Sequence, residues 1–356
     1  MKKNYLGQLV VKWYKKENCN MPWRINSDPY SIWISEIMLQ QTQVKTVIPY
    51  YNNWMKKLPN VDSLANSHID DVLKLWEGLG YYSRAHNLYY SAKEIIKKHN
   101  GVFPNSYNQL IRLRGIGDYT ASAILSIAFK KKNPVFDGNI RRIFSRLFTL
   151  KKDSQIIIKA KTEMLKYMDD CNPSDINQAM MDFGRLICSP KKPQCGICIL
   201  NQVCKAHITN NVSSYPELKK RSIKPVYNVA VGFIIKNNKI LISKRKKNKL
   251  LGGLWELPGG KKKKREPLLN CLKREVLEEL DIKIDISQKI GNIKHKYSHF
   301  DVNLTGYTCY YNQGTPKPLN SDGIKWIQFN EIKNFAFPKS TLKLFNLYET
   351  YNRHNT

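Results

Sequence analysis

The sequence predicts a two-domain protein in which an all-α domain is followed by an α+β domain. The chain has 356 residues, more than a single hydrophobic core usually organises. Apolar residues recur every three or four positions from residue 6 to about residue 206, which is the helical period. After Pro225 the chain changes to β-rich runs, so a second domain with a different architecture begins there.

The first domain, residues 1–206, is expected to contain helices and no strand. Its clearest amphipathic segments, bounded by capping or turn residues, are 31–39, 72–79, 120–129 and 140–150. The polar stretch 207–225 that follows ends in Pro225 and has the composition of an interdomain connector.

The second domain, residues 226–356, is expected to be α+β. Runs 226–235 and 239–243 are rich in β-formers and are separated by Lys-Asn-Asn, a hairpin signal. Residues 268–280 form a strong amphipathic pattern, 302–311 predicts another strand, and 341–348 predicts a last helix.

The net charge of the chain and its N-terminal sequence indicate which partners and which compartment to expect. Fifty-nine Lys and Arg against 28 Asp and Glu give a net charge of +31, which favours a polyanionic partner, nucleic acid first among them. A biased, Lys-rich composition accounts for part of this excess. The N-terminus lacks a secretory pattern, and no apolar run has the length of a membrane span. We therefore expect a cytoplasmic protein whose cysteines are reduced.

Four of the eight cysteines fall close together, as Cys188, Cys195, Cys198 and Cys204. Such a group with a central Cys-x-x-Cys indicates a metal site. Zinc is the competing ligand, but zinc sites usually pair two such knuckles or add His, whereas unequal spacing in a single loop suits an iron-sulfur cluster. Lys191 and Lys192 lie between the first two cysteines, where a loop could present cations to phosphate.

Residues 113–121 have the pattern of a helix, a glycine turn and a new helix. Gly115 and Gly117 permit positive φ and the close approach of a phosphate, and the amides of the next helix supply an anion site. This pattern resembles a helix-hairpin-helix. Val-Phe-Asp-Gly-Asn follows at residues 135–139, a combination typical of one DNA glycosylase superfamily.

Two carboxylates are candidates for chemistry on a glycosidic bond, which needs an acid for the leaving group and an anion for the sugar cation. Glu36 lies in an apolar helix pattern, where burial raises the pKa of a carboxyl group. The plain alternative is a solvated helix glutamate. Asp137 precedes a helix, and its plain alternative is an N-cap, a role compatible with catalysis.

Several motifs together resemble the MutY-type adenine DNA glycosylases of the endonuclease III superfamily. They occur in one order and cover nearly all of the first two hundred residues: 22–24, 35–43, 76–84, the hairpin, 136–139, 177–182 and the cysteine loop. The resemblance implies that Glu36 protonates adenine and then helps to activate water, and that Asp137 stabilises the sugar cation. It also implies an adenine pocket lined by Arg24, Tyr119 and Asn139.

The same resemblance implies a 4Fe-4S cluster on the four cysteines and a monomer acting on double-stranded DNA with adenine opposite 8-oxoguanine or guanine. Extrusion of a base costs stacking energy, and Gln41 and Tyr82 are expected to enter the vacated stack. The other expected DNA contacts are Gly115, Gly117, Lys191 and Lys192.

An endonuclease III-like enzyme that also cuts the strand is the nearest rival. Its lysine nucleophile would stand in the hairpin at the position that Tyr119 occupies here. Without that amine, we expect excision by water and no strand cleavage.

The second domain resembles a Nudix domain. Gly260, Glu266 and the run 274–279 match the Nudix box, with Asp281 at the usual glycine position. Glu275, Glu278 and Glu279 could converge on a divalent cation, or form an exposed acidic face paired with basic residues. We expect little or no nucleotide hydrolysis, with a two-activity enzyme as the alternative.

The stretch 295–300 resembles the loop with which the MutY family reads 8-oxoguanine. By this resemblance Tyr297, Ser298 and His299 are expected to contact the lesion strand.

Overall fold

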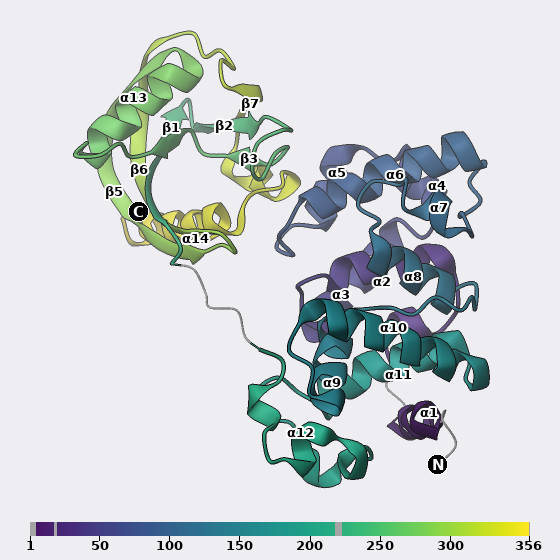
Figure 1. Ribbon diagram of the computed structural model, residues 1–356. Helices are drawn as coiled ribbons and strands as arrows, with labels where there is room; N and C mark the ends of the chain where they lie inside the picture. The colour runs from purple at the N-terminus through teal and green to yellow at the C-terminus, as the bar shows by residue number, and fades with distance from the viewer. Residues whose placement is uncertain (1–4, 18–19, 218–222, 356) are drawn as a thin grey trace. The chain divides into compact units, whose positions relative to one another are not determined.

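The computed structural model describes residues 5–17, 20–217 and 223–355, so residues 218–222 of the expected connector lie outside it. Contacts divide the chain into two units (Figure 1). The first comprises residues 1–66 and 87–220, and the second comprises residues 67–86 and 221–356. Each unit is described by itself.

The described residues up to 217 form helices and no strand, as expected. The α-helices are α1 Tyr5–Glu17, α2 Pro29–Leu39, α3 Val44–Lys57, α4 Val61–Asn66, α5 Ile69–Leu75, α6 Ser83–His99, α7 Tyr107–Leu110, α8 Asp118–Ile127, α9 Gly138–Phe148, α10 Asp153–Asp170, α11 Pro173–Leu186 and α12 Lys205–Ile208. Short 3₁₀ helices occupy Pro22–Arg24, Cys195–Ile197, Asn201–Val203 and Val212–Ser214.

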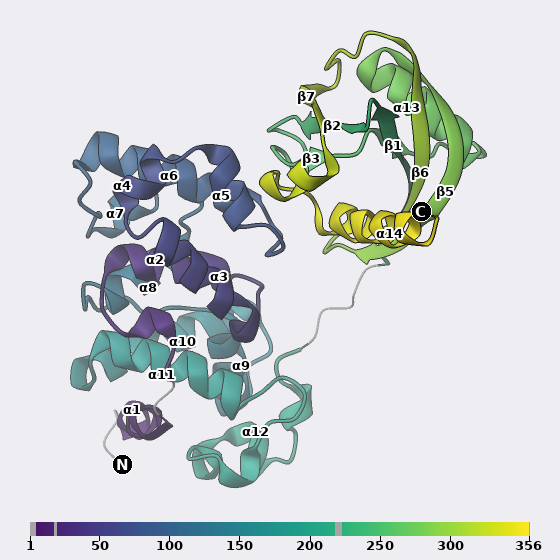
Figure 2. The same ribbon diagram turned by 180° about the vertical axis from the view of Figure 1, so that it is seen from behind.

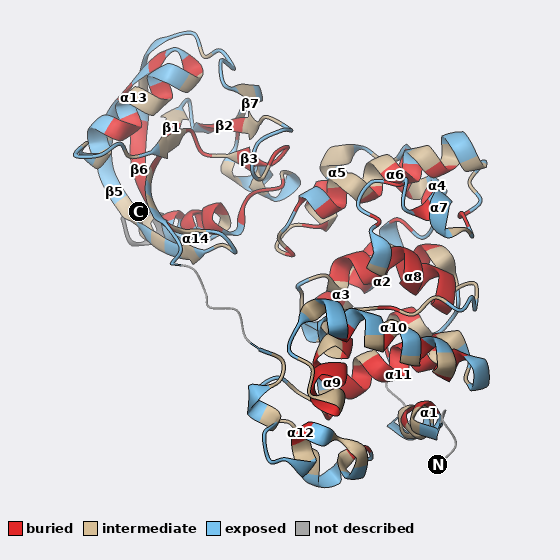
Figure 3. Cartoon of the chain, in the orientation of Figure 1, coloured by how far each residue is buried: buried red, intermediate tan, exposed pale blue. Residues whose placement is uncertain are grey.

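Helix α2 runs through the interior of the first unit. It begins at Pro29 because Asp28 accepts a hydrogen bond from the Ser31 amide (2.7 Å) and proline suits the first helical position. Nine of its eleven residues are buried, and it packs against α3 and α8 (Figure 3). A polar residue on α2 therefore faces protein on nearly every side.

The expected helix 72–79 is wrong at its C-terminal end, because α5 ends at Leu75. Gly78 has a φ of 99° and Gly80 a φ of 75°, so the chain turns instead of continuing the helix. The Trp76 indole donates to the Gly80 carbonyl (3.0 Å) and fixes this turn.

The second unit contains a mixed seven-stranded sheet with the order β3-β2-β1-β6-β5, to which β4 adds on β1 and β7 on β2. Its strands are β1 Val226–Lys236, β2 Lys239–Arg245, β3 Trp255–Glu256, β4 Gly259–Lys261, β5 Ile282–Lys296, β6 Asp301–Gly314 and β7 Ser321–Ile327. Strands β1 and β6 are parallel, with Val226 opposite Asp301, and β5 pairs antiparallel with β6.

Helices α13 Leu268–Leu280 and α14 Lys339–Asn355 lie on opposite faces of this sheet (Figure 1 and Figure 2). Alternate residues of β1 explain the arrangement. Ala230 and Ile234 belong to the core under α13, whereas Val231 and Phe233 belong to the core under α14. The fold class expected for each half is confirmed.

No helix in the described part of the chain is long and apolar enough to cross a membrane.

Candidate active site

The first unit contains a cavity of about 420 Å³. Its walls come from α2, α8, α11, the 3₁₀ helix at Pro22–Arg24 and the start of α9. Both candidate carboxylates, Glu36 and Asp137, line it, as do the three expected adenine-pocket residues Arg24, Tyr119 and Asn139. Residues far apart in the sequence are thus brought to one cavity.

Glu36 is the more deeply buried acid. It is 5% exposed, so the solvated-glutamate alternative does not hold. Burial raises the pKa of its carboxyl group, with a further contribution from Asp137, and the hydrogen bond from Tyr119 and the charge of Arg24 oppose this rise. A carboxyl group in this environment keeps its proton to higher pH than usual and can serve as an acid.

The Tyr119 hydroxyl donates to Glu36 Oε2 at 2.6 Å. Burial, together with the negative charges of Glu36 and Asp137, raises the pKa of Tyr119 well above its ordinary value. The phenol therefore stays protonated and remains a hydrogen-bond donor to the carboxyl group.

Asp137 caps α9 while facing the cavity. Its Oδ1 accepts from the amides of Asn139 (3.0 Å) and Ile140 (2.8 Å), and its Oδ2 accepts from the Asn139 side chain (2.7 Å). Burial raises the pKa of Asp137, and these donors oppose the rise by stabilising the carboxylate. The two acids thus have different surroundings, since three donors hold the charged form of Asp137 and one neutral phenol faces Glu36.

Helix α11 supplies polar cavity residues to which the sequence analysis assigned no role. Asp182 forms ion pairs with Arg24 and with Arg185, and Gln178 also lines the cavity. Arg24 stacks over the Tyr14 ring, with its guanidinium carbon 5.5 Å from the ring centroid. Asp182, an acidic residue that α11 buries, was the signal in the sequence that could have pointed to this role.

Two expected DNA contacts lie at turns. Gln41 is exposed directly after α2 and has a φ of 58°. Gly115 has a φ of 78°, and a Cβ atom there would lie 2.7 Å from the Asn87 Cβ, so glycine is required.

Gly117 does not use positive φ, which corrects the expectation for this residue. It has a φ of −96° and precedes α8 without a side-chain cap, and a Cβ atom there would meet nothing within 4 Å. No side chain therefore caps the start of α8.

The expectation for Tyr82 conflicts with its position. Tyr82 is 5% exposed, and its hydroxyl accepts from the Gly78 amide at 3.1 Å, so it supports the turn from inside. Its neighbour Tyr81 is 37% exposed and has a φ of 48°. The guanidinium of Arg84 lies 5.4 Å from the Tyr81 ring centroid. The side chain that reaches the surface here is Tyr81.

All four cysteines of the predicted metal loop line one cavity of about 30 Å³, together with Arg146. Burial raises the pKa of Cys198 to about 11, and the other three thiols are near enough to contribute to this rise. The Arg146 guanidinium donates to Cys188 Sγ at 3.3 Å, as suits a thiolate. Within the described residues, however, no group of three or more His, Cys, Asp or Glu side chains is arranged to hold a metal ion. Lys191 and Lys192 are exposed.

Residues 297–300, here called the reading loop because the sequence predicts that they read the lesion strand, join β5 to β6 in the second unit. Tyr297 is half-buried, stacks on Phe300 with 4.9 Å between ring centroids, and its hydroxyl lies 3.1 Å from Ser340 Oγ. Ser298 and His299 are exposed at the tip. The Ser298 hydroxyl forms a hydrogen bond with that of Tyr81, which belongs to the same unit.

The Nudix-box residues lie on α13 and before it. Asp281 ends α13 in the left-handed conformation, with a φ of 58°, so it adopts the turn that glycine would adopt. Arg274 forms ion pairs with Glu275 and Glu278, which favours the salt-paired acidic face over a cation site.

Both halves of the chain match known protein families. Residues 34–167 match the family described as HhH-GPD superfamily base excision DNA repair protein, and residues 230–347 match the NUDIX domain family. The chain is 34% identical to the adenine DNA glycosylase of Buchnera aphidicola subsp. Baizongia pistaciae over 98% of both proteins. It is 29% identical to the adenine DNA glycosylase of Rattus norvegicus over 97% of this chain and 78% of that protein.

Among solved structures, a thermostable thymine-DNA glycosylase superposes with a TM-score of 0.52 and 26% identity, covering 58% of this chain and 97% of that protein. A non-covalent endonuclease III–DNA complex superposes with a TM-score of 0.51 and 20% identity over 59% of this chain and 98% of that protein, which supports the fold alone.

Proposed function

The chain belongs to the family of adenine DNA glycosylases, enzymes of base excision repair, and on that basis we propose that it releases adenine paired with 8-oxoguanine or guanine by hydrolysis, without cutting the strand. The observation that carries the proposal is the shared cavity of Glu36, Asp137 and Tyr119. A cavity of about 420 Å³ can hold one extruded base.

In the proposed reaction, protonated Glu36 donates its proton to a ring nitrogen of adenine. The bond between the base nitrogen and C1′ then breaks, and the bonding electrons leave with the base. The Asp137 carboxylate stabilises the positive charge on the sugar. Water adds to C1′, and the Glu36 carboxylate accepts the proton that this water loses, which restores the acid.

The polar set on α11 suits recognition of the base. The Gln178 Nε2 donates to the hydroxyl (2.9 Å) and carbonyl (3.3 Å) of Ser174, so its side-chain oxygen is the group available as an acceptor. Asp182, held by Arg24 and Arg185, offers a carboxylate to an exocyclic amine. We propose that Arg24, Asn139, Gln178 and Asp182 bind adenine in the cavity. Because Tyr119 stands where the lyase lysine would be, no amine is supplied there for a Schiff base.

For contacts outside the cavity, we propose that Gln41 and Tyr81 enter the base stack, with Tyr81 replacing Tyr82 because Tyr82 is buried. The open start of α8, with Gly115 and Gly117, would bind a phosphate. Lys191 and Lys192, both exposed, would bind other phosphates of the DNA backbone. Ser298 and His299 would read the base opposite adenine, with Tyr297 holding their loop.

We propose that Cys188, Cys195, Cys198 and Cys204 hold a 4Fe-4S cluster, because four thiols line a common cavity beside the Arg146 guanidinium. When bound, the cluster would supply four iron–thiolate bonds that cross-link residues 188–204. Arg142 connects the cysteine loop to the cavity that holds Glu36 and Asp137. It donates to the Cys188 carbonyl (2.7 Å) and to Oδ1 of Asn139 (2.8 Å), which lines that cavity.

The test is adenine release from duplexes that differ only in the base opposite adenine. We expect fast adenine release opposite 8-oxoguanine, slower release opposite guanine and little release opposite thymine. Equal rates on the three duplexes would contradict the proposed specificity, and the absence of release from all three would contradict the activity.

A further inference from the structure

The second unit carries a concentrated run of positive charge between β4 and α13. Residues 261–265 read Lys-Lys-Lys-Lys-Arg and are here called the lysine loop. Four of the five are exposed, and Lys262 is half-exposed. Lys263 lies 4.0 Å from Glu278, and no described acidic side chain forms an ion pair with the other four.

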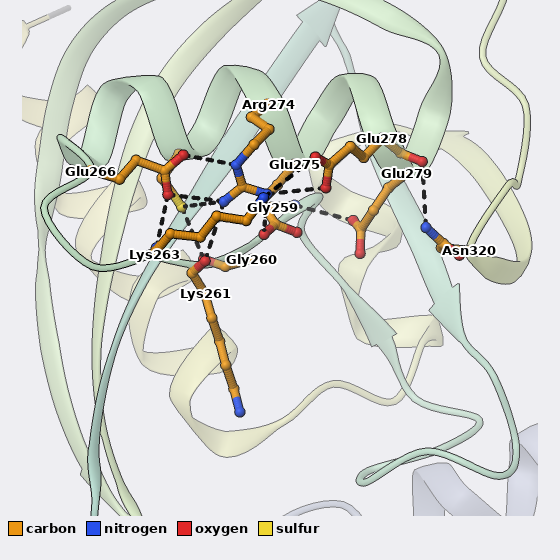
Figure 4. A network of polar contacts seen from close by, with 11 residues as sticks. Gly259, Gly260, Lys261, Lys263, Glu266, Arg274, Glu275, Glu278, Glu279 and Asn320 are labelled. Atoms are coloured by element: carbon orange, nitrogen blue, oxygen red, sulfur yellow. Dashed lines mark hydrogen bonds and ion pairs between the residues drawn. The ribbon is translucent and has the colours of Figure 1, made fainter.

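A network centred on Arg274 fixes the lysine loop (Figure 4). The Arg274 guanidinium binds both carboxylate oxygens of Glu266 at 2.7 and 2.9 Å. Glu266 Oε2 also accepts from the Lys263 amide at 2.8 Å. Arg274 further donates to the Lys261 carbonyl (3.4 Å), so both ends of the loop are tied to α13.

The same arginine neutralises the acidic residues nearby. It donates to Glu275 (2.7 Å) and to Glu278 (3.0 Å) in addition to Glu266. Three of the four Nudix-box carboxylates are therefore occupied by one guanidinium. The Lys261 side chain extends away from these carboxylates (Figure 4), and Lys264 and Arg265 are exposed, so the positive charge of the loop stays accessible.

A row of aromatic rings runs from the lysine loop to the reading loop. The Lys261 ammonium lies 3.6 Å from the centroid of the Tyr227 ring. Tyr227 contacts Phe300 with 5.4 Å between centroids, and Phe300 stacks on Tyr297 at 4.9 Å. Side-chain contacts thus connect the loop that exposes Ser298 to the lysine loop.

We propose that the lysine loop is a DNA-contact surface that binds backbone phosphates of the duplex flanking the base read by Ser298 and His299. This inference rests on the proposed function for the identity of the partner. Lysine ammonium groups bind phosphates as point charges and release condensed counterions from DNA. Because Arg274 and Glu266 already hold the loop, binding loses less conformational freedom than it would with a flexible tail. In this chain the Nudix box serves to build that surface.

The test measures the dissociation constant of the full-length protein for a lesion duplex at several salt concentrations. Lys262→Gln/Lys264→Gln removes two charges from the loop, and Lys283→Gln/Lys289→Gln removes two exposed charges from β5 as the matched control. Each lost phosphate contact lowers the slope of log affinity against log salt by about 0.9. The loop variant should lower it by about 1 to 2 and bind several-fold more weakly, whereas the control should keep the wild-type slope. Equal slopes in the two variants would overturn the proposal.

A second experiment tests whether the contacts of Arg274 and Glu266 hold the lysine loop in place. Glu266→Gln keeps the side-chain size and weakens the bond to Arg274, so amide hydrogen exchange at 261–266 should quicken and affinity for the duplex should fall. Lys273→Gln, which removes an exposed charge from α13 but no partner of Glu266, should leave the exchange rate at 261–266 unchanged. Unchanged exchange and affinity in Glu266→Gln would show that Arg274 does not organise the loop.

Two further measurements separate this inference from its rivals. Binding or hydrolysis of 8-oxo-dGTP with Mg²⁺, lost in Lys262→Gln/Lys264→Gln while the DNA salt slope is retained, would assign the loop to a nucleotide and overturn the proposal. Adenine release at saturating enzyme should be the same in the loop variant and the wild type. A wild type that binds duplex through the loop yet releases no adenine would count against the proposed function and leave this inference intact.

Discussion

At the scale of single residues, catalysis depends on contacts between distant positions. Glu36 could be proposed from the sequence because its motif is apolar on both sides, and Asp137 because it begins a helix. The bond from Tyr119 to Glu36 joins α8 to α2, and no local pattern reveals it. The sequence analysis gave Asp182 and Arg185 no role, because the ion pair of Asp182 with Arg24 joins α11 to the distant segment Pro22–Arg24.

Replacing Glu36 with Gln or Asp137 with Asn should lower adenine release by about 100-fold or more, because each removes a group that acts on the breaking bond. Binding of the lesion duplex should stay near the wild-type value, since phosphate contacts do not use these protons. Single-turnover release and a binding titration measure the two quantities. Wild-type release in either variant would remove that residue from the mechanism.

Tyr81→Ala and Tyr82→Phe should behave differently. Loss of the exposed ring at Tyr81 removes the proposed filler of the base stack, so release should fall by about tenfold as extrusion becomes more costly. Tyr82→Phe removes the hydroxyl that accepts from the Gly78 amide and donates to the Phe337 carbonyl, and should cost about 1 kcal/mol of folding stability with little change in release. The opposite pattern would restore Tyr82 as the inserted residue.

At the scale of elements, periodicity located the long amphipathic segments well. Helix α13 has the expected bounds, and β1 and β2 begin at the expected residues. The helix expected at 72–79 failed because its apolar pattern continues through a glycine turn. The buried stripe of α6, Ala85, Leu88 and Ala92, extends back to Tyr82, and this spacing could have placed Tyr82 in the core. Strand β5 was missed because most of it is polar and exposed.

Helix α13 makes stability depend on pH through Glu279. Burial, followed by the charge of Glu256, raises the pKa of Glu279 from 4.5 to about 7. Between these pH values the folded chain binds more protons than the unfolded chain, so the Glu279 contribution to the free energy of unfolding falls as pH rises through the window. Glu279→Gln should therefore stabilise the protein by about 1 to 2 kcal/mol more at pH 8 than at pH 5.

Denaturant unfolding of the full chain at both pH values measures this difference. Glu278→Gln, at the exposed neighbouring position, is the control for the loss of a carboxylate from α13. An equal effect of Glu279→Gln at pH 5 and pH 8 would mean that the folded state does not raise the pKa of this carboxyl group.

At the scale of the whole molecule, the sequence indicated a helical unit that does chemistry and a second unit with a Nudix-type sheet. The division by contacts differs from a cut at one position, because residues 67–86 join the second unit. Their hydrogen bonds explain this: Glu77 accepts from the Phe337 amide (2.8 Å), and Lys244 forms an ion pair with Asp70 (2.6 Å). Such pairings between remote segments leave no signal in a single sequence.

If the second unit reads the base opposite adenine, variants of its loop should change the preference for 8-oxoguanine over guanine more than the rate of adenine release. Ser298→Ala/His299→Ala should reduce the ratio of release rates opposite 8-oxoguanine and guanine by about tenfold, the effect of a lost polar contact of 1 to 2 kcal/mol. Asn346→Ala, an exposed position on α14, should leave the ratio unchanged. Equal losses on both duplexes would argue against reading by this loop.

The most direct test of hydrolytic excision is product analysis of a single turnover on a duplex with adenine opposite 8-oxoguanine. Because Tyr119 supplies no amine, we expect free adenine and an equal amount of intact strand that carries an abasic site. That strand should break only after alkali or heat. Strand cleavage by the enzyme before such treatment, or a covalent complex trapped by borohydride, would contradict this expectation.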